Sequence, residues 1–289
     1  MAAASLATWL AVRAVQPPAM RELEALRSGP VWAPILADGF PTLIVVGDYY
    51  IFGDSDDGLD PARLVREYTI NSRADLDEFL MLHPDKAARY IDLNLRYLPV
   101  GSAFALRDVL PLVSLGPRSP RVRVILASAL TPEMLKTNNV VYVGYLSGLG
   151  TLRDTVFAGS RFSVGGSFDE IVDGKTRRRY LSQEGGPSVE GHMDRDYGYF
   201  STFKGPAGNR IVIVAGTRDA GLMQTAEAVA GSASLKQVVH RAGGGDSFES
   251  LFEVEGMDQQ NLNGRLLLSS PLNSLSKWRS LPQKAFPAG

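Results

Sequence analysis

The residues best suited to chemistry form a glycine-rich turn after a buried strand. Val140–Val143 is a β-branched and aromatic run that predicts such a strand. Three glycines follow, at Gly144, Gly148 and Gly150. A glycine loop between a strand and a helix offers free backbone N–H groups to an anionic ligand. The spacing matches neither the dinucleotide fingerprint nor the phosphate loop that ends in Gly-Lys-Ser/Thr, so a tight turn needed for packing alone is the alternative.

The segment after this turn is expected to begin a helix. Thr151 and Asp154 have the spacing of a capping box, in which a hydroxyl and a carboxylate bind free N–H groups of the first turn. Tyr145 and Ser147 add two further hydroxyl groups to the turn itself. We therefore expect this turn to contribute both backbone and side-chain groups to a ligand site.

Two other loops follow buried strands in the same way. Asp48 comes just after the apolar run Leu43–Val46, and Arg218 comes just after Arg210–Ala215. Because ligands of parallel α/β sheets bind beyond the carboxyl ends of the strands, all three loops are expected to meet in one crevice. The predicted ligand-binding residues are Gly47, Asp48, Tyr49, Gly144, Tyr145, Ser147, Gly148, Gly150, Thr151, Gly216, Thr217 and Arg218.

No set of residues in the sequence identifies a reaction. His192 is the one histidine beside two carboxylates, Asp194 and Asp196, and a surface loop is the alternative to an acid–base or metal role there. Gly53–Gly58 resembles a calcium-binding loop but lacks the glutamate at its twelfth position, which favours a solvated loop. The motifs of serine hydrolases and zinc proteases do not occur. We assign no catalytic residue, metal site or cofactor from the sequence.

Composition narrows the class of protein. The 289 residues are 45% hydrophobic and 21% charged, as in an ordinary globular chain. Thirty basic and 31 acidic residues leave a net charge of −1, and the one basic run, Lys175–Arg179, fits the solvated strand of a hairpin. The absence of cysteine excludes disulfides and thiol catalysis.

The order of apolar runs and helical segments predicts an α/β fold. Strands that alternate with helices indicate a Rossmann-like three-layer sandwich with a mixed, mostly parallel sheet plus antiparallel hairpins. The parallel core strands are expected at 43–46, 121–126, 140–143 and 210–215, with the last added through a hairpin. Antiparallel pairs are expected at 168–172 with 177–181 and at 248–254 with 264–268.

Local signals predict where several helices begin. Thr131 before Pro132 fits a helix start, and Ser72 with Asp75 forms a capping box. Pro61 after Asp60 suggests one more helix start. His240 is expected at the end of a strand or in a loop.

The chain divides into an N-terminal apolar segment at 1–18, a single α/β domain at 19–270 and a polar tail at 271–289. Ala2–Val12 is too short to span a bilayer, which needs about 20 residues. It fits an ordinary first helix, a helix on a surface, or the end of a membrane anchor.

The order of these parts resembles an uncharacterised bacterial family. In that family an α/β domain lies behind a membrane segment, often with a winged-helix domain further upstream. The resemblance covers roughly residues 30–255, and it differs at Tyr145–Gly150, where the family has a Pro-Arg-x-Asn-Pro-like run. It implies that Ala2–Val12 is the tail of a membrane helix, and hence a membrane-associated, extracytoplasmic domain; a cytoplasmic one is the alternative. The matching segments are Trp32–Leu36, Leu43–Gly47, Asn139–Gly144, Arg210–Gly216 and Thr225–Ala228.

Three functions fit this sequence. The first is a small-molecule-binding or sensory domain, possibly tethered to a membrane, that takes a small polar or anionic ligand in the crevice. The second is an enzyme that uses the same crevice, such as a nucleotide or sugar hydrolase or transferase. The third is a structural or interaction domain without a ligand. The oligomeric state does not follow from the sequence.

We expect no specific binding to DNA or RNA, because the charge is balanced and the sequence shows no basic stripe. The measurement is a titration of labelled duplex at two salt concentrations. Submicromolar binding that weakens steeply with salt would contradict the expectation, since such a slope reports contacts with phosphates.

Overall fold

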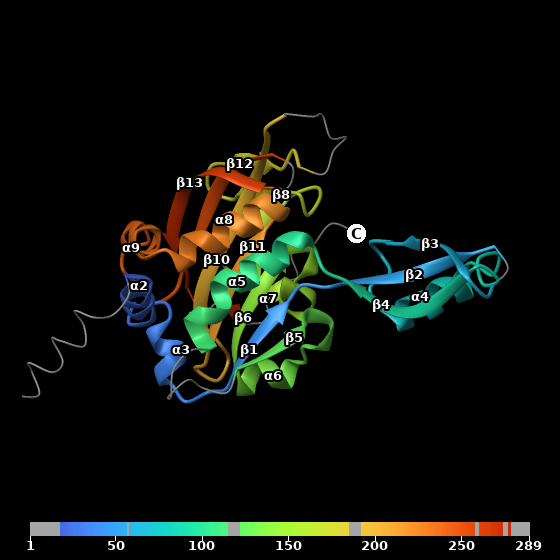
Figure 1. Ribbon diagram of the computed structural model, residues 1–289, viewed down its shortest axis with the longest axis horizontal. Helices are drawn as coiled ribbons and strands as arrows, with labels where there is room; N and C mark the ends of the chain where they lie inside the picture. Colours follow the sequence, from blue (N-terminus) through green and yellow to red (C-terminus); the bar gives the residue numbers. More distant parts are fainter. Residues whose placement is uncertain are drawn as a thin grey trace, which may run out of the picture.

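The computed structural model describes residues 18–56, 58–114, 122–184, 192–257, 260–273 and 277–278. A seven-stranded sheet in the order β13-β12-β10-β11-β6-β1-β5 runs through the body (Figure 1). β5, β1, β6 and β11 are parallel, and β10, β12 and β13 continue the sheet as antiparallel strands. This confirms a mixed α/β sheet with the expected parallel core. The strands are β1 (Thr42–Val46), β5 (Val122–Leu126), β6 (Asn139–Tyr145), β10 (Asp194–Lys204), β11 (Arg210–Gly216), β12 (Phe248–Met257) and β13 (Gln260–Pro271).

Both faces of this sheet are buried. Alternate residues of each core strand point to opposite faces, so Ile44 joins one apolar cluster and Leu43 the other. The helices α2, α5, α8 and α9 cover the first face, and α6, α7 and the turns around them cover the second. The helices of the body are α2 (Pro18–Arg27), α3 (Ala33–Ala37), α5 (Val100–Ser114), α6 (Pro132–Thr137), α7 (Arg153–Phe157), α8 (Asp219–Ala230) and α9 (Ser232–Arg241).

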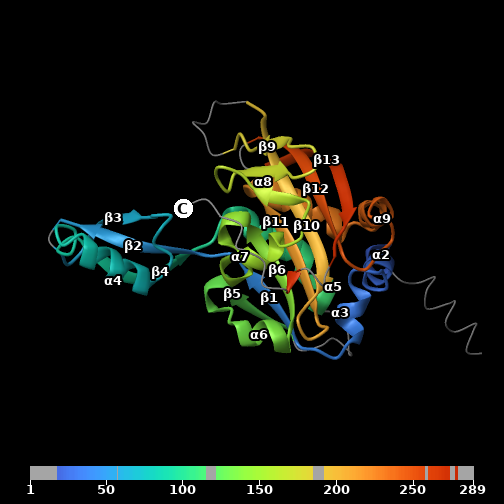
Figure 2. The same ribbon diagram turned by 180° about the vertical axis from the view of Figure 1, so that it is seen from behind.

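An arm projects from the body between β1 and α5 (Figures 1 and 2). It consists of β2 (Tyr49–Ser55), β3 (Pro61–Val65), α4 (Arg73–Leu82) and β4 (Tyr90–Tyr97), with the sheet order β3-β2-β4. The arm has its own small core, in which Tyr50, Phe52 and Leu76 are buried. As predicted, Ser72 caps α4 by accepting a hydrogen bond from the Asp75 N–H.

The expected helix at Asp60-Pro61 is wrong, because Pro61 begins β3. β3 is an edge strand, where proline is tolerated because one side of the strand needs no ladder hydrogen bonds. The loop expected at Gly53–Gly58 is also wrong in part, since β2 runs to Ser55. Asp54 there binds two arginines, Arg63 and Arg89, instead of facing water.

A second small sheet confirms the hairpin expected after residue 160. It contains β7 (Phe162–Val164), β8 (Glu170–Asp173) and β9 (Arg179–Leu181). Asp173, which is buried, makes a bidentate hydrogen bond with Arg161, and Arg179 pairs with Glu170. The Arg161 guanidinium holds the pKa of the Asp173 carboxyl far below its usual range. The basic run Lys175–Arg179 therefore forms most of the turn between β8 and β9 and not the expected strand, since only Arg179 belongs to β9.

Other local predictions have mixed outcomes. Thr131 caps α6 by accepting a hydrogen bond from the Met134 N–H, as expected. His240 lies in the last turn of α9 and not in a strand or loop, because Leu235 and Val238 supply a buried helical stripe. Of the expected polar tail, Lys277 is described, and its ammonium donates to the Val156 carbonyl at 2.6 Å.

The expected apolar helix and the expected membrane anchor both concern Ala2–Val12, which lies outside the described residues. Of the helices that the structure describes, none is both long and apolar enough to cross a membrane.

Candidate functional site

The three predicted loops lie at one edge of the main sheet. β1 and β6 are adjacent and parallel, and so are β6 and β11. Val46 is level with Val143, and Gly216 is level with Tyr145, so all three strands end at nearly the same height. The loops that follow β1, β6 and β11 therefore lie at the same edge of the sheet, as the strand order predicted.

Three of the predicted glycines surround the hydroxyl of Tyr142. This buried hydroxyl donates to the Tyr145 carbonyl at 2.5 Å. A Cβ on Gly144 would lie 2.7 Å from the hydroxyl and 2.9 Å from the backbone of Gly47. A Cβ on Gly148 would lie 3.0 Å from the same hydroxyl. These glycines allow close packing of the strand ends, which is the alternative that the sequence left open.

The turn after β6 does not form the expected helix N-terminus. Thr151 donates its hydroxyl to the Leu130 carbonyl at 3.1 Å, and no side-chain cap is present at α7. The buried side chains of Leu149 and Leu152 draw the turn into the core as 3₁₀ turns. Gly150 has a φ of +52°, which favours glycine there. The predicted capping box is therefore wrong, whereas the anion site expected at this turn stays a prediction.

Asp48 joins the body to the arm. Its carboxylate accepts hydrogen bonds from the Ser128 N–H at 2.9 Å and from the Ser128 hydroxyl at 2.7 Å. Arg96 of β4 forms an ion pair with it at 3.6 Å. The side chain of Asp48 is fully buried, so it has a structural role at this joint.

Tyrosines from the arm and the body meet beside this joint. The Tyr49 hydroxyl lies 2.5 Å from the Ser147 hydroxyl, and its ring lies 6.4 Å from the Tyr145 ring. Tyr97 of β4 lies 6.2 Å from Tyr49, and the Arg66 guanidinium is 5.0 Å above the Tyr49 ring. Burial raises the pKa of both the Tyr49 and the Tyr145 hydroxyls, so they stay neutral. The charge of Arg218 acts on both Tyr49 and Tyr97. We call Tyr49, Tyr97, Tyr145, Arg66 and Arg218 the edge cluster.

The third predicted segment begins α8. Gly216 leaves no room for a side chain against the backbone of Leu222. The Thr217 hydroxyl hydrogen-bonds the buried Asp196 carboxylate. The Arg218 guanidinium donates a hydrogen bond to the Asp169 carboxylate at 2.7 Å, so Asp169 neutralises part of the positive charge that was predicted to bind a ligand.

Three carboxylates surround the N-terminus of α8. Asp196 accepts a hydrogen bond from the Gly221 N–H at 2.6 Å, and Glu184 accepts one from the Ala220 N–H at 3.1 Å. The Asp219 carboxylate accepts one from the Gly101 N–H at 2.7 Å. The positive end of this helix is thus already bound by the chain's own negative groups.

Glu184 has the most unusual titration at this edge. Burial raises the pKa of its carboxyl to about 8, and the nearby charges of Asp196 and Asp219 add to the rise. Sequence reasoning missed this group, because Glu184, Asp196 and Asp219 are far apart along the chain. Only Asp196 carried a signal, through its place near His192. His192 itself is exposed and lies 3.7 Å from Asp194.

Among the residues that the structure describes, no group of three or more histidine or acidic side chains is arranged so that it could hold a metal ion. No family model, curated protein or solved structure matches the chain. The site must therefore be interpreted from its own geometry.

Gly144→Ala is expected to destabilise the fold by about 1–3 kcal/mol, because the new Cβ overpacks the Tyr142 hydroxyl and Gly47. Urea denaturation measures the loss. Gly166→Ala is the matched control, since the nearest atom to its Cβ would lie at 3.8 Å. Equal stability of the two variants would show that Gly144 has no packing role.

Glu184→Gln is expected to make the fold more stable than the parent at pH 8.5 and equally stable at pH 4. Between the unfolded pKa of 4.5 and about 8, the folded chain holds a proton that the unfolded chain releases. This contribution to stability is complete below the unfolded pKa and is lost as the pH rises through that window. Glutamine stays neutral throughout.

The expected gain is about 1 kcal/mol after allowing for partial solvent screening, or about 2–4 °C in Tm. Thermal melts across the pH range measure it. Glu133→Gln, an exposed glutamate on α6, is the control and should show the parent's profile. If the Tm of Glu184→Gln depended on pH in the same way as the Tm of the parent, the raised pKa of Glu184 would be disproved.

Proposed function

We propose that this chain is a small-molecule-binding, sensory domain whose ligand binds at the edge cluster. The observation that carries the proposal is the meeting of neutral phenols and guanidinium groups from segments far apart in the sequence. They meet beyond the carboxyl ends of the parallel strands, where α/β sheets bind ligands. The proposal includes a Rossmann-like three-layer fold, supported by the helices on both sheet faces.

The exposed groups of this edge define the ligand chemistry that we propose. Tyr97 is 47% exposed and Tyr68 is 53% exposed, which leaves ring surface for stacking. Arg66 lies between the rings of Tyr49 and Tyr68, at 5.0 and 5.2 Å. Neutral hydroxyls donate and accept hydrogen bonds, so a small polar ligand with a planar or anionic part fits these groups best.

The arm supports a sensory role. Tyr49 and Tyr97 belong to the arm, whereas Tyr145 and Ser147 belong to the body. A ligand that binds both sets favours one orientation of the arm over others, by as much as its affinities for the two orientations differ. The membrane tether and extracytoplasmic location that the resemblance implies would suit such a sensor, and they remain part of the proposal.

An enzyme is the second candidate, and Glu184 is the observation that favours it. A carboxyl with a pKa of about 8 is protonated at neutral pH and can act as a general acid. Its neighbour Asp196 accepts a hydrogen bond from the Gly221 N–H, and the charge of Asp196 adds to the rise of the Glu184 pKa. Turnover of a bound compound, lost in Glu184→Gln, would separate this candidate from the sensory one.

A panel of nucleotides, sugars and amino acids is expected to contain a compound that raises the Tm. A hundredfold excess over Kd stabilises a fold by about 2.7 kcal/mol, which is roughly 5–10 °C here. Tyr97→Ala should abolish the shift and leave the unliganded Tm nearly unchanged, since this side chain is half exposed.

Leu64→Ala, another exposed position of the arm, is the matched control and should keep the response. Either of two outcomes would contradict the proposal. One is a panel without any stabilising compound, and the other is an undiminished shift in Tyr97→Ala.

A further inference from the structure

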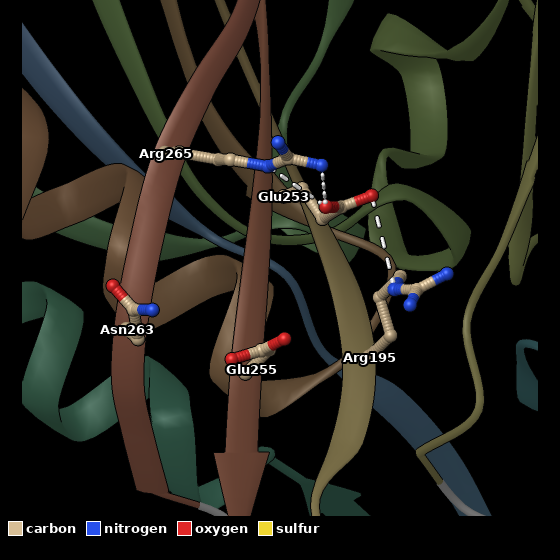
Figure 3. A pocket seen from close by; sticks show the side chains of 5 residues that line it. All are labelled: Arg195, Glu253, Glu255, Asn263 and Arg265. Carbon is tan, nitrogen blue, oxygen red and sulfur yellow. Dashed lines mark hydrogen bonds and ion pairs between the residues drawn. The ribbon is translucent and has the colours of Figure 1, made fainter.

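A hollow of about 320 Å³ lies on the antiparallel part of the main sheet (Figure 3). Its wall comes from three adjacent strands, β10, β12 and β13. Gly256 and Gly264 of these strands approach side chains of α8, so the lining residues point away from that helix by alternation. The lining residues are Arg195, Glu253, Glu255, Asn263 and Arg265.

One carboxylate fixes two arginines in this hollow. Glu253, whose side chain is only 9% exposed, accepts hydrogen bonds from Arg265 at 2.9 and 2.5 Å. Arg195 approaches it from the other side, at 3.8 Å. The Tyr197 hydroxyl donates to it at 3.4 Å. Figure 3 shows the two guanidinium groups on either side of this carboxylate.

These contacts leave donors for a ligand. An arginine has five N–H groups, and Arg265 gives two of them to Glu253. A buried carboxylate between two guanidinium groups neutralises one positive charge and leaves the other. This end of the hollow therefore attracts an anion, with donors in positions that Glu253 has fixed.

The opposite end has acceptors. Glu255 is level with Arg195 on one side and with Asn263 on the other. Among the five side chains of Figure 3, no dashed line joins Glu255 or Asn263 to the others, and the charge of Glu255 acts on Arg265 from beyond ion-pair distance. Glu255 lies two residues beyond Glu253, which is about 7 Å along a strand. A positive and a negative end thus lie a short distance apart.

We propose that this hollow binds a short zwitterion of the α-amino acid type. Its carboxylate would contact Arg195 and Arg265, and its ammonium would contact Glu255. A simple anion would meet the charge of Glu255, and a simple cation would meet the arginines. The two arginines and two glutamates sum to zero charge, so a ligand with both charges satisfies both ends. This site is separate from the edge cluster and does not depend on it.

Calorimetric titration of the full chain tests the proposal with glycine, serine, glutamate and lysine, and with acetate and methylammonium as single-charge probes. At least one amino acid should bind at least tenfold more tightly than acetate and methylammonium. If no amino acid binds at about 10 mM, well above a millimolar Kd, the hollow holds an internal ion-pair network only and the proposal is overturned.

Two variants assign the ends. Glu255→Gln should weaken binding of the amino acid at least tenfold and should not weaken binding of acetate. Arg195→Met should weaken both, while Arg265 still neutralises Glu253. Glu78→Gln, an exposed glutamate on the arm, is the matched control and should bind like the parent. Unchanged affinity in Glu255→Gln, with a parent-like Tm, would overturn the assignment.

Discussion

The packing of one phenol ring between two strand ends determines how closely the arm approaches the body. Tyr142 fills the space where β1 and β6 end side by side, and its hydroxyl leaves room only for glycine at Gly47, Gly144 and Gly148. Because the strand ends approach so closely, Tyr49 reaches the Ser147 hydroxyl. The attachment of the arm, and with it the composition of the edge cluster, follows from this packing.

The distribution of charge at the same edge has a second cause. The N–H groups at the start of α8 have no partner within the helix and attract negative charge, and Asp196 and Glu184 supply it from the chain itself. An external anion therefore has little to gain at that helix. Proton binding to Glu184 is favoured instead, because its carboxyl is buried and the charges of Asp196 and Asp219 lie nearby. The ligand chemistry that we propose therefore rests on the phenols and on the charge of Arg66. The Arg66 guanidinium also donates to the Ile70 carbonyl at 3.1 Å and to the Asn71 side chain at 2.9 Å.

The sequence predicted correctly those elements that are determined by residues close together along the chain. Continuous β-branched and aromatic runs such as Val140–Val143 predicted the parallel strands. Because parallel strands end at the same edge of a sheet, this prediction also placed the loops that follow them at one edge. Sequence reasoning failed where tertiary packing overrides local signals. Thr151 has the right spacing for a cap, yet burial of Leu149 and Leu152 determines the turn. Pro61 resembles a helix start, yet its place at a sheet edge makes it the first residue of a strand.

The meeting of the three loops at one sheet edge was predicted from the sequence, but the chemistry of the candidate site there was not. The glycines were the visible signal, and they prove to be packing residues. The titrating group, Glu184, depends on Asp196 and Asp219, which only the folded chain brings to it. The same is true of the hollow on β12, where Arg195 and Arg265 meet Glu253 across a ladder of strands. A single sequence does not reveal such cross-strand registers.

The arm has a consequence for how this architecture can diversify. Its first and last paired residues, Tyr49 and Tyr97, lie opposite each other on β2 and β4, so the chain leaves and re-enters the body at nearly one point. The arm also buries its own apolar residues, and none of them belongs to the two clusters of the body. An insertion whose ends lie side by side and which has its own hydrophobic core can be shortened, exchanged or lost without disrupting the core of the domain that carries it. The part of the proposed ligand site that the arm supplies is thus modular, and under this proposal the same body could acquire a different specificity by exchanging one continuous segment of chain.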